Sequence, residues 1–530
     1  MGKAALVVSG GILASRLLGQ VRESLFAAML GATDVTDQYV AAFRVPDFLN
    51  YLLAGGFLAI TFVPIFTKYL ADDDQEGGWV ALTSVIRPLT LGIVGLVIIG
   101  WVAAPWFIET LYPNFTAEQV TNTVRLTRIV LPAQVFFVVG ALFVAVQYAM
   151  GVFTIPAVAP VAYNLGIIAG GVGYALVTGD PDPEGFAWGA LVGAFVGNFA
   201  LQYWGARRLG MRLIRGTPWG NPVVWEYIKI AFPLMIGQSI VVLDETYMSI
   251  FGDFAGDGAQ TQLQYARRTM LVPVGVVAQA AGVAAYPFMA RLFAEGRFRE
   301  MADTVDRAMR WVIVLSLGAT GLLAALSVPT IRVLFERFNF TQLDTVNTAS
   351  VLVVYALAIP IWGGLAVLTR AFYARRQMWT PVIVGTIAAV VAVPLYALLQ
   401  ERLGIEGVAL SSVLTLGGYT LVLGYLWYSE PDHRNRVSNV LTGAIRSIPL
   451  ALGGALAAIA VSWAIGEALP TGFVAALLQV MGGSLAFAAV VFLAGGLLYG
   501  VAGPGPGAPP VDEPDLAAAG TPDGTPTSEA

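Results

Sequence analysis

Long apolar stretches constrain the fold of this chain more than any motif does. Stretches of roughly 20 residues, each able to cross the ~30 Å hydrocarbon core of a bilayer as a helix, recur throughout the 530 residues. The composition agrees, with 57% hydrophobic residues, 12% charged residues and a mean hydropathy of +0.73. A helix satisfies its own backbone hydrogen bonds, which lipid cannot do. We therefore predict an all-α integral membrane protein with almost the whole chain in one membrane domain.

About fourteen transmembrane helices are predicted from these stretches. The expected spans are 4–30, 37–70, 79–110, 118–149, 152–177, 185–206, 224–253, 261–292, 307–334, 345–373, 379–400, 405–428, 438–467 and 471–501. The first span is expected to be retained, because the apolar stretch after Lys3 shows no cleavage site of small residues.

Arginine is unevenly distributed among the connections, and this predicts the orientation, since cytoplasmic loops carry an excess of Lys and Arg. One set of connections contains Arg207, Arg208, Arg212, Arg215, Arg291, Arg297, Arg299, Arg375, Arg376, Arg434 and Arg436. The other set is mostly acidic, with Asp34, Asp37, Glu109, Glu118, Asp180, Glu184, Asp253, Asp257 and Glu467, although Arg332, Arg337 and Arg402 are exceptions. Both termini are therefore predicted to be cytoplasmic.

Two blocks of six helices look duplicated. Gln38 and Tyr39 precede an arginine and a proline in span two, and Gln264 and Tyr265 do the same in span eight. Parallel repeats of this kind are a known transporter plan, with the substrate site between the halves. We predict an N-terminal lobe in 1–215, a second lobe in 216–430, two additional helices in 431–502, and a disordered cytoplasmic tail in 503–530, where little apolar surface can be buried.

Charged residues inside the predicted spans are the strongest indication of function. An Arg at the centre of a membrane helix costs about 2.5–3.5 kcal/mol on insertion scales, so it needs a partner, a cavity or a path to the interface. The charges in spans one, two and eight include Arg16, Arg22, Glu23, Arg44, Asp47, Arg267 and Arg268. Structural ion pairs, such as Arg22 with Glu23 or Asp47, would explain some of them. Several cations in corresponding places of two repeats instead favour a cationic cavity between the lobes.

A cationic cavity predicts an anionic and phosphorylated substrate, because the planar guanidinium of arginine grips phosphate at two points. The chain has no Cys, a single His and no nucleotide-binding or zinc-binding motif, so we expect a transporter, and not an enzyme, without metal or cofactor. Its net charge of −5 and scattered basic residues give no indication of nucleic-acid binding.

Short segments spread over the chain match a family pattern. They are Ser15 to Gly19, Arg22-Glu23, Gly31-Ala32, Asp37, Ala42 to Pro46, Phe62 to Pro64, Ile155 to Ala157, Ala159-Pro160, Asn164, Arg370 to Arg375 and Thr380-Pro381. Together they resemble the MurJ (MviN) family, the lipid II flippases of the multidrug/oligosaccharidyl-lipid/polysaccharide exporter superfamily. The resemblance covers residue 1 to about residue 500.

The resemblance implies two six-helix lobes in a V, with two C-terminal helices forming a groove for a lipid tail. It implies alternating access that moves lipid II, the undecaprenyl-pyrophosphate-linked peptidoglycan precursor, across a bacterial cytoplasmic membrane, with membrane lipids and cell-wall synthesis machinery as partners. The residues that it assigns to the pyrophosphate are Arg16, Arg22 and Arg268, with Arg44 as a further basic position. It assigns Asp37 as a functional acid on the outer side, and Glu23 is a second candidate acid.

This chain departs from the family pattern in span two and at the ion site. Asp47, Asn50 and Gly55 stand where family members commonly have Asn, Arg and Glu, so either the substrate differs somewhat or Arg44 and Arg267 supply the missing contact. Asp244 could be the acid of a sodium site, but residues 390–393 offer no further polar ligand. Sodium coupling is therefore doubtful, and the membrane potential is the expected energy source.

Two other functions stay open at this point. A related exporter of the superfamily, moving another polyprenyl-linked glycan, would share the architecture. A membrane scaffold that recruits envelope-synthesis partners without transporting anything would predict that neutralising Arg16 or Arg268 is harmless.

Overall fold

Every regular element is a helix in the part of the chain that the computed structural model describes, which is residues 2–53, 57–214, 220–430 and 437–499. The first elements are α1 (Gly2–Leu30), α2 (Asp34–Ala42), α3 (Arg44–Leu53), α4 (Phe57–Ala71), α5 (Gln75–Leu111), α6 (Ala117–Val130), α7 (Ala133–Ala149), α8 (Thr154–Thr178), α9 (Pro183–Gly193), a π-helical turn η1 (Ala194–Ala200) and α10 (Leu201–Arg208). The expected tail 503–530 and the departure at Gly55 lie outside the described residues.

The second part of the chain continues with helices only. These are α11 (Pro222–Asp253), α12 (Ala259–Ala294), α13 (Phe298–Ala325), α14 (Ser327–Leu334), α15 (Gln342–Ala356), α16 (Ala358–Ala374), α17 (Trp379–Tyr428), α18 (Val437–Ala468) and α19 (Phe473–Tyr499). Helix α17 covers two expected spans, and its backbone leaves the helical conformation at Gly404, with φ 59° and ψ −132°.

Eight helices within the described residues are long and apolar enough to cross a membrane, or nine if α15 and α16, which meet at 41°, form one bent span. The all-α membrane class is thereby confirmed, while the count of fourteen remains a prediction. The expected spans outside this set are 4–30, 37–70, 224–253 and 261–292. Each of these four spans includes residues whose side chains lie outside the described part of the chain, and each carries charged residues.

The expected second span is broken into α2, α3 and α4, and a proline accounts for the first break. Pro46 has no N–H to donate to the carbonyl of Ala42, four residues earlier. The hydroxyl of Thr127 on α6 donates to that carbonyl instead, at 3.2 Å. The break turns the chain at Phe43 and places Arg44 at the start of a new helix.

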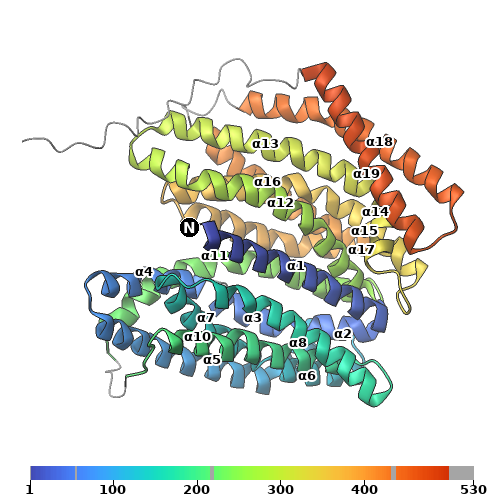
Figure 1. Ribbon diagram of the computed structural model, residues 1–530. Coiled ribbons are helices and arrows are strands. Elements are labelled where there is room, and N and C mark those ends of the chain that lie inside the picture. The colour runs from blue at the N-terminus through green and yellow to red at the C-terminus, as the bar shows by residue number, and fades with distance from the viewer. Residues whose placement is uncertain (1, 54–56, 215–219, 431–436, 500–530) are drawn as a thin grey trace, which may run out of the picture.

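The helices form two groups (Figure 1). Helices α2 to α10 lie on one side and α12 to α17 on the other, with α1 and α11 between them, while α18 and α19 pack on α13 and α14. Each group has its own apolar core, around Phe62 and Leu142 in the first and around Met309 and Trp427 in the second. A third cluster joins the groups through residues such as Phe26 of α1 and Tyr265 of α12.

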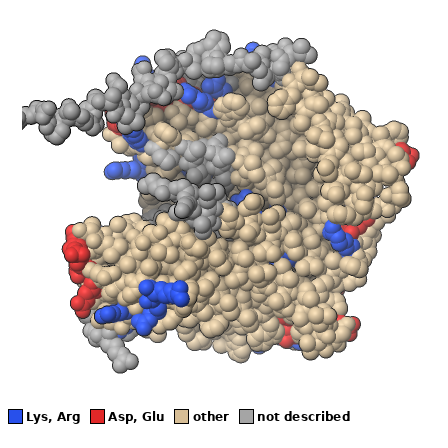
Figure 2. All heavy atoms as spheres, in the orientation of Figure 1, with Lys and Arg blue, Asp and Glu red and all other residues tan. Residues whose placement is uncertain are grey.

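The two groups touch at the end of the bundle where α1 ends, which we call the closed end. There the backbone N–H and hydroxyl of Thr261 donate to Asp37 at 2.8 and 2.7 Å, and Asn339 donates to the carbonyl of Met29 at 2.6 Å. Gly258, with φ +80°, packs directly against the backbone of Ala32. A Cβ added at Gly258 would lie 2.3 Å from the carbonyl oxygen of Ala32. At the opposite end, Figure 2 shows a recess in the outline between the two groups.

Candidate functional site

A polar cavity of about 160 Å³ lies between α1, α2, α3, α8, α9 and α12. Its polar lining residues are Arg22, Glu23, Arg44, Asp47, Gln264 and Arg268, and aromatic side chains form most of the remaining wall. The structure thus brings together charges from the first, second and eighth expected spans. With three arginines and two acids, the lining carries one surplus cation.

One side of helix α1 packs on α8, so the opposite side faces the cavity. A Cβ at Gly11 would lie 2.8 Å from the carbonyl oxygen of Ala157, and Asn164 donates to the carbonyl of Ser15 at 3.4 Å. Arg16 and Glu23 are seven residues apart and therefore share a face of α1. That face looks toward α12, where Gln264, Arg268 and Gly275 also share one face.

Glu23 is held by two arginines at once. Arg22 and Arg268 both donate to its Oε1 atom, and the Glu23 side chain is 13% exposed, against 38% for that of Arg268. The structural ion pair between Arg22 and Glu23 is therefore present. One carboxylate cannot neutralise two guanidinium groups, so this part of the cavity remains attractive to an anion.

Arg16 lies outside the cavity lining but on the same side of α1. Its guanidinium contacts Gly275 of α12, since a Cβ added at Gly275 would lie 3.0 Å from Nη1 of Arg16. In the described part of the chain no acid forms an ion pair with Arg16, whose side chain is exposed. It stands about 10 Å from Glu23 along the helix axis, toward the end opposite the closed end.

Arg44 lines the cavity but is buried and held by acids. Its side chain is 5% exposed, its Nε donates to the carbonyl of Val40 at 3.2 Å, and its terminal nitrogens lie 3.7 Å from Asp47 and 3.7 Å from Glu245 of α11. Asn50, one of the departures from the family pattern, does not line the cavity.

Arg267 does not face the cavity, because it lies about 100° around α12 from Arg268. Its guanidinium pairs with Asp244 of α11 at 2.5 Å and lies 3.6 Å from Glu245. The expectation that Arg267 contacts substrate therefore finds no support in its position. The charges form a continuous series that crosses α3, α11 and α12, in the order Asp47, Arg44, Glu245, Arg267 and Asp244.

Both carboxylate oxygens of Asp244, the candidate acid of an ion site, are already used. Oδ2 accepts from Arg267 and from the hydroxyl of Ser412 at 3.0 Å, and Oδ1 accepts from Tyr396 at 2.8 Å. The Arg267 guanidinium supplies the positive charge that a sodium ion would bring, so these residues do not fit a bound cation. Among the described residues there is also no cluster of three His, Cys, Asp or Glu suited to a metal.

Asp37 belongs to the closed end and not to the cavity. It accepts both hydrogen bonds from Thr261, and its side chain is buried between α2 and α12. Its position therefore connects it with the contact between the two groups of helices.

Several residues of the site were not identified from the sequence. Glu245 could have been recognised as a second acid beside Asp244 inside an apolar span, since such a charge is costly in lipid. Gln264 stands one helical turn before Arg268 and could have been found by that spacing. Tyr396 and Ser412 carry no signal in the sequence, because tyrosine and serine are ordinary residues of membrane helices.

The comparisons with known proteins agree with this architecture. A family model described as "Lipid II flippase MurJ" matches residues 26–481. A "Probable lipid II flippase MurJ" of Rhizobium tropici is 31% identical over 424 residues, which are 78% of each chain, and a "Lipid II flippase MurJ" of Burkholderia cenocepacia is 26% identical over 78% of this chain and 83% of its own.

Solved structures show the same fold. A structure described as "Lipid II flippase MurJ, inward closed conformation" matches with a TM-score of 0.75, at 21% identity over 93% of this chain and 99% of that chain. An inward-facing multidrug resistance transporter of the MATE family matches with a TM-score of 0.63, at 16% identity over 81% of this chain and 96% of its own.

Proposed function

This chain belongs to the MurJ family of lipid II flippases, and we propose that it moves lipid II from the inner to the outer leaflet by alternating access. It is a transporter and not an enzyme, and it is a multi-pass protein of the bacterial inner membrane. The observation that carries the substrate assignment is the cavity with a surplus cation between α1 and α12, where Arg22 and Arg268 share a single acid.

The pyrophosphate binds by replacing Glu23 as the partner of the two arginines. A diphosphate offers more oxygen atoms and more negative charge than one carboxylate, and each guanidinium can grip it at two points. Arg16, about two helical turns nearer the recessed end, is in place to meet the phosphate on its way in. Glu23 then keeps the two arginines paired whenever the substrate is absent, because an unpaired charge in the membrane is costly.

The full architecture that we propose has about fourteen spans, with two six-helix lobes in a V and α18 and α19 outside them. Both termini lie in the cytoplasm, so the closed end faces the outside and the recess in Figure 2 faces the cytoplasm. The likeness to an inward closed structure supports this assignment of the state. The hydrogen bonds of Asp37 and Asn339 must break before the site opens outward.

The polyprenyl tail has a candidate groove in the second half of the chain. An apolar pocket of about 930 Å³ lies between α13, α16, α17 and α18, with Ile313, Leu368 and Leu441 in its lining. Its walls are almost free of charge, as a hydrocarbon chain requires. The expected groove of two C-terminal helices is thus supported for α18, whereas no described residue of α19 lines this pocket.

The membrane potential is the energy source that we propose, without a sodium ion. Moving one charge across the membrane is worth about 2.3 kcal/mol per 100 mV, so a site with surplus positive charge is reoriented by the potential itself. The ion pair that Arg267 forms with Asp244 supports this choice. Contacts with the cell-wall synthesis machinery, which would receive the product, are part of the same proposal.

Complementation tests the function. The chain is expressed in a bacterium whose own lipid II flippase can be depleted, and growth and the undecaprenyl-linked precursor inside the cell are measured. Growth without accumulation of precursor is expected. Accumulation despite normal membrane abundance of the chain would refute the proposal, and rescue of a different polyprenyl-linked glycan pathway would favour the related exporter.

A further inference from the structure

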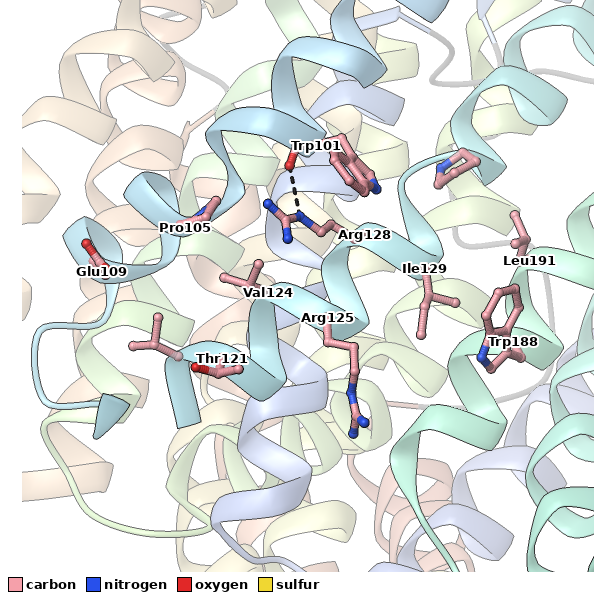
Figure 3. Close-up of a pocket in the computed structure, with 12 residues that line it drawn as sticks. Trp101, Pro105, Glu109, Thr121, Val124, Arg125, Arg128, Ile129, Trp188 and Leu191 are labelled. Carbon is pink, nitrogen blue, oxygen red and sulfur yellow. Dashed lines mark hydrogen bonds between the residues drawn. The ribbon is translucent and has the colours of Figure 1, made fainter. Parts of the chain in front are cut away.

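A third pocket, which shares no residue with the central cavity, lies on the outer face of the first group of helices (Figure 3). It has a volume of about 630 Å³ and is formed by α5, α6 and α9. The surrounding surface of α5 is turned to lipid, since Val102 and Trp106 are 65% and 62% exposed. Trp101 and Trp188 stand at its margin, and tryptophan prefers the level of the lipid headgroups.

Arg128 is fixed in this pocket by a carbonyl that a proline leaves free. Pro105 has no N–H to donate to the carbonyl of Trp101, four residues earlier in α5. Arg128 of α6 donates its Nε to that carbonyl at 3.1 Å, and its guanidinium stacks over the Trp101 ring at 4.4 Å from the centroid. The guanidinium is thus held by one edge and one face, and its terminal amino groups remain for a ligand.

Among the described residues, one cation and one acid of this pocket have no ion-pair partner. Arg125 is neutralised by Glu184 of α9 at 3.1 Å. In the part of the chain that the structure describes, neither Arg128 nor Glu109 forms an ion pair, although both line the pocket. Glu109 lies about two helical turns beyond Trp101 on α5, about 12 Å further along the helix axis, and it also lines the pocket.

We propose that this pocket binds a phospholipid whose headgroup carries both a phosphate and a primary ammonium group, as phosphatidylethanolamine does. Arg128 donates to the phosphate and Glu109 accepts from the ammonium, so that each unpaired charge meets its opposite. The acyl chains lie along the apolar face of α5. A choline headgroup cannot donate hydrogen bonds to Glu109, and a glycerol headgroup brings no cation to it. This lipid is not the transported substrate, and the inference does not depend on the proposed function.

Lipid retention by the purified full-length protein tests the inference. Native mass spectrometry compares phosphatidylethanolamine, phosphatidylcholine and phosphatidylglycerol with identical acyl chains. The protein should retain phosphatidylethanolamine about tenfold more strongly than the other two lipids. Arg128→Gln should remove most binding of all three, whereas Glu109→Gln should abolish only the preference for phosphatidylethanolamine.

Arg208→Gln is the matched control, because Arg208 also stacks on a tryptophan, Trp204 at 3.8 Å, but does not line this pocket. It should retain lipid as the unchanged protein does. Equal retention of the three lipids, a stronger retention of phosphatidylglycerol, or an equal loss in Arg128→Gln and Arg208→Gln would overturn the proposal. If Arg128→Gln does not fold, Glu109→Gln decides, since an unchanged preference in that variant also overturns it.

Discussion

Glu23 of α1 forms an ion pair with Arg268 of α12 and so joins the two halves of the chain through the centre of the membrane domain. Seven residues earlier in α1, Arg16 lies against Gly275, which is seven residues later in α12. The two helices therefore run antiparallel and present the same faces to each other over about two turns. A phosphate that enters from the recessed end meets Arg16 first and the Glu23 pair second.

The position of Arg16 predicts an effect of a larger residue at Gly275. Gly275→Val places methyl groups where Nη1 of Arg16 now lies, at 3.0 Å from an added Cβ, so the guanidinium must leave this position. The affinity of the purified protein for lipid II should fall roughly tenfold, the worth of one charge-assisted hydrogen bond. Gly92→Val is the control, since no atom lies within 4 Å of a Cβ at Gly92. Equal affinities in the two variants would contradict the role of Arg16.

The buried ion pair between Arg267 and Asp244 should stabilise the fold, and no sodium ion should be needed for this. Asp244→Asn leaves the Arg267 guanidinium, whose side chain is only 5% exposed, without its closest partner. Breaking a buried pair on one side costs about 3–5 kcal/mol, whereas replacing both charges by apolar residues is often close to neutral. Thermal unfolding of the detergent-solubilised protein should therefore show a lower midpoint for Asp244→Asn than for the double variant Asp244→Leu/Arg267→Met.

Thermal unfolding also tests whether sodium binds at Asp244. Exchange of sodium for potassium should leave the unfolding midpoint of the unchanged protein where it is, because Asp244 has no free oxygen to offer. A midpoint that rises with sodium and loses this response in Asp244→Asn would show that a cation site exists and that the potential alone is not the energy source.

The orientation can be measured with single cysteines, since the chain has none of its own. Cysteines at Asp182 and Gly256 should react with a membrane-impermeant thiol reagent in intact cells, because these connections lie outside. Cysteines at Arg212 and Arg297 should react only after the membrane is permeabilised. The reverse pattern would place both termini outside and would turn the recess away from the cytoplasm.

The sequence predicts the class of fold and much of the cavity, because charges in lipid are costly and helical spacing is regular. Arg16 and Glu23 share a face by their spacing alone. The position of Arg267 could not be predicted, since its neighbour Arg268 has the same chemistry and only the packing of α11 and α17 decides which of them meets Asp244. The contact of Arg128 with the carbonyl of Trp101 depends likewise on the register between α5 and α6.

The affinity of the purified protein for lipid II tests most directly whether Arg268 binds the pyrophosphate and Glu23 competes with it. Arg268→Ala should weaken binding about tenfold to a hundredfold, and Arg268→Lys, which keeps the charge but loses the two-pronged contact, should fall between it and the unchanged protein. Glu23→Gln should strengthen binding, because the arginines lose the carboxylate that occupies them. Unchanged affinity in Arg268→Ala, or a loss in Glu23→Gln as large as that in Arg268→Ala, would contradict the account.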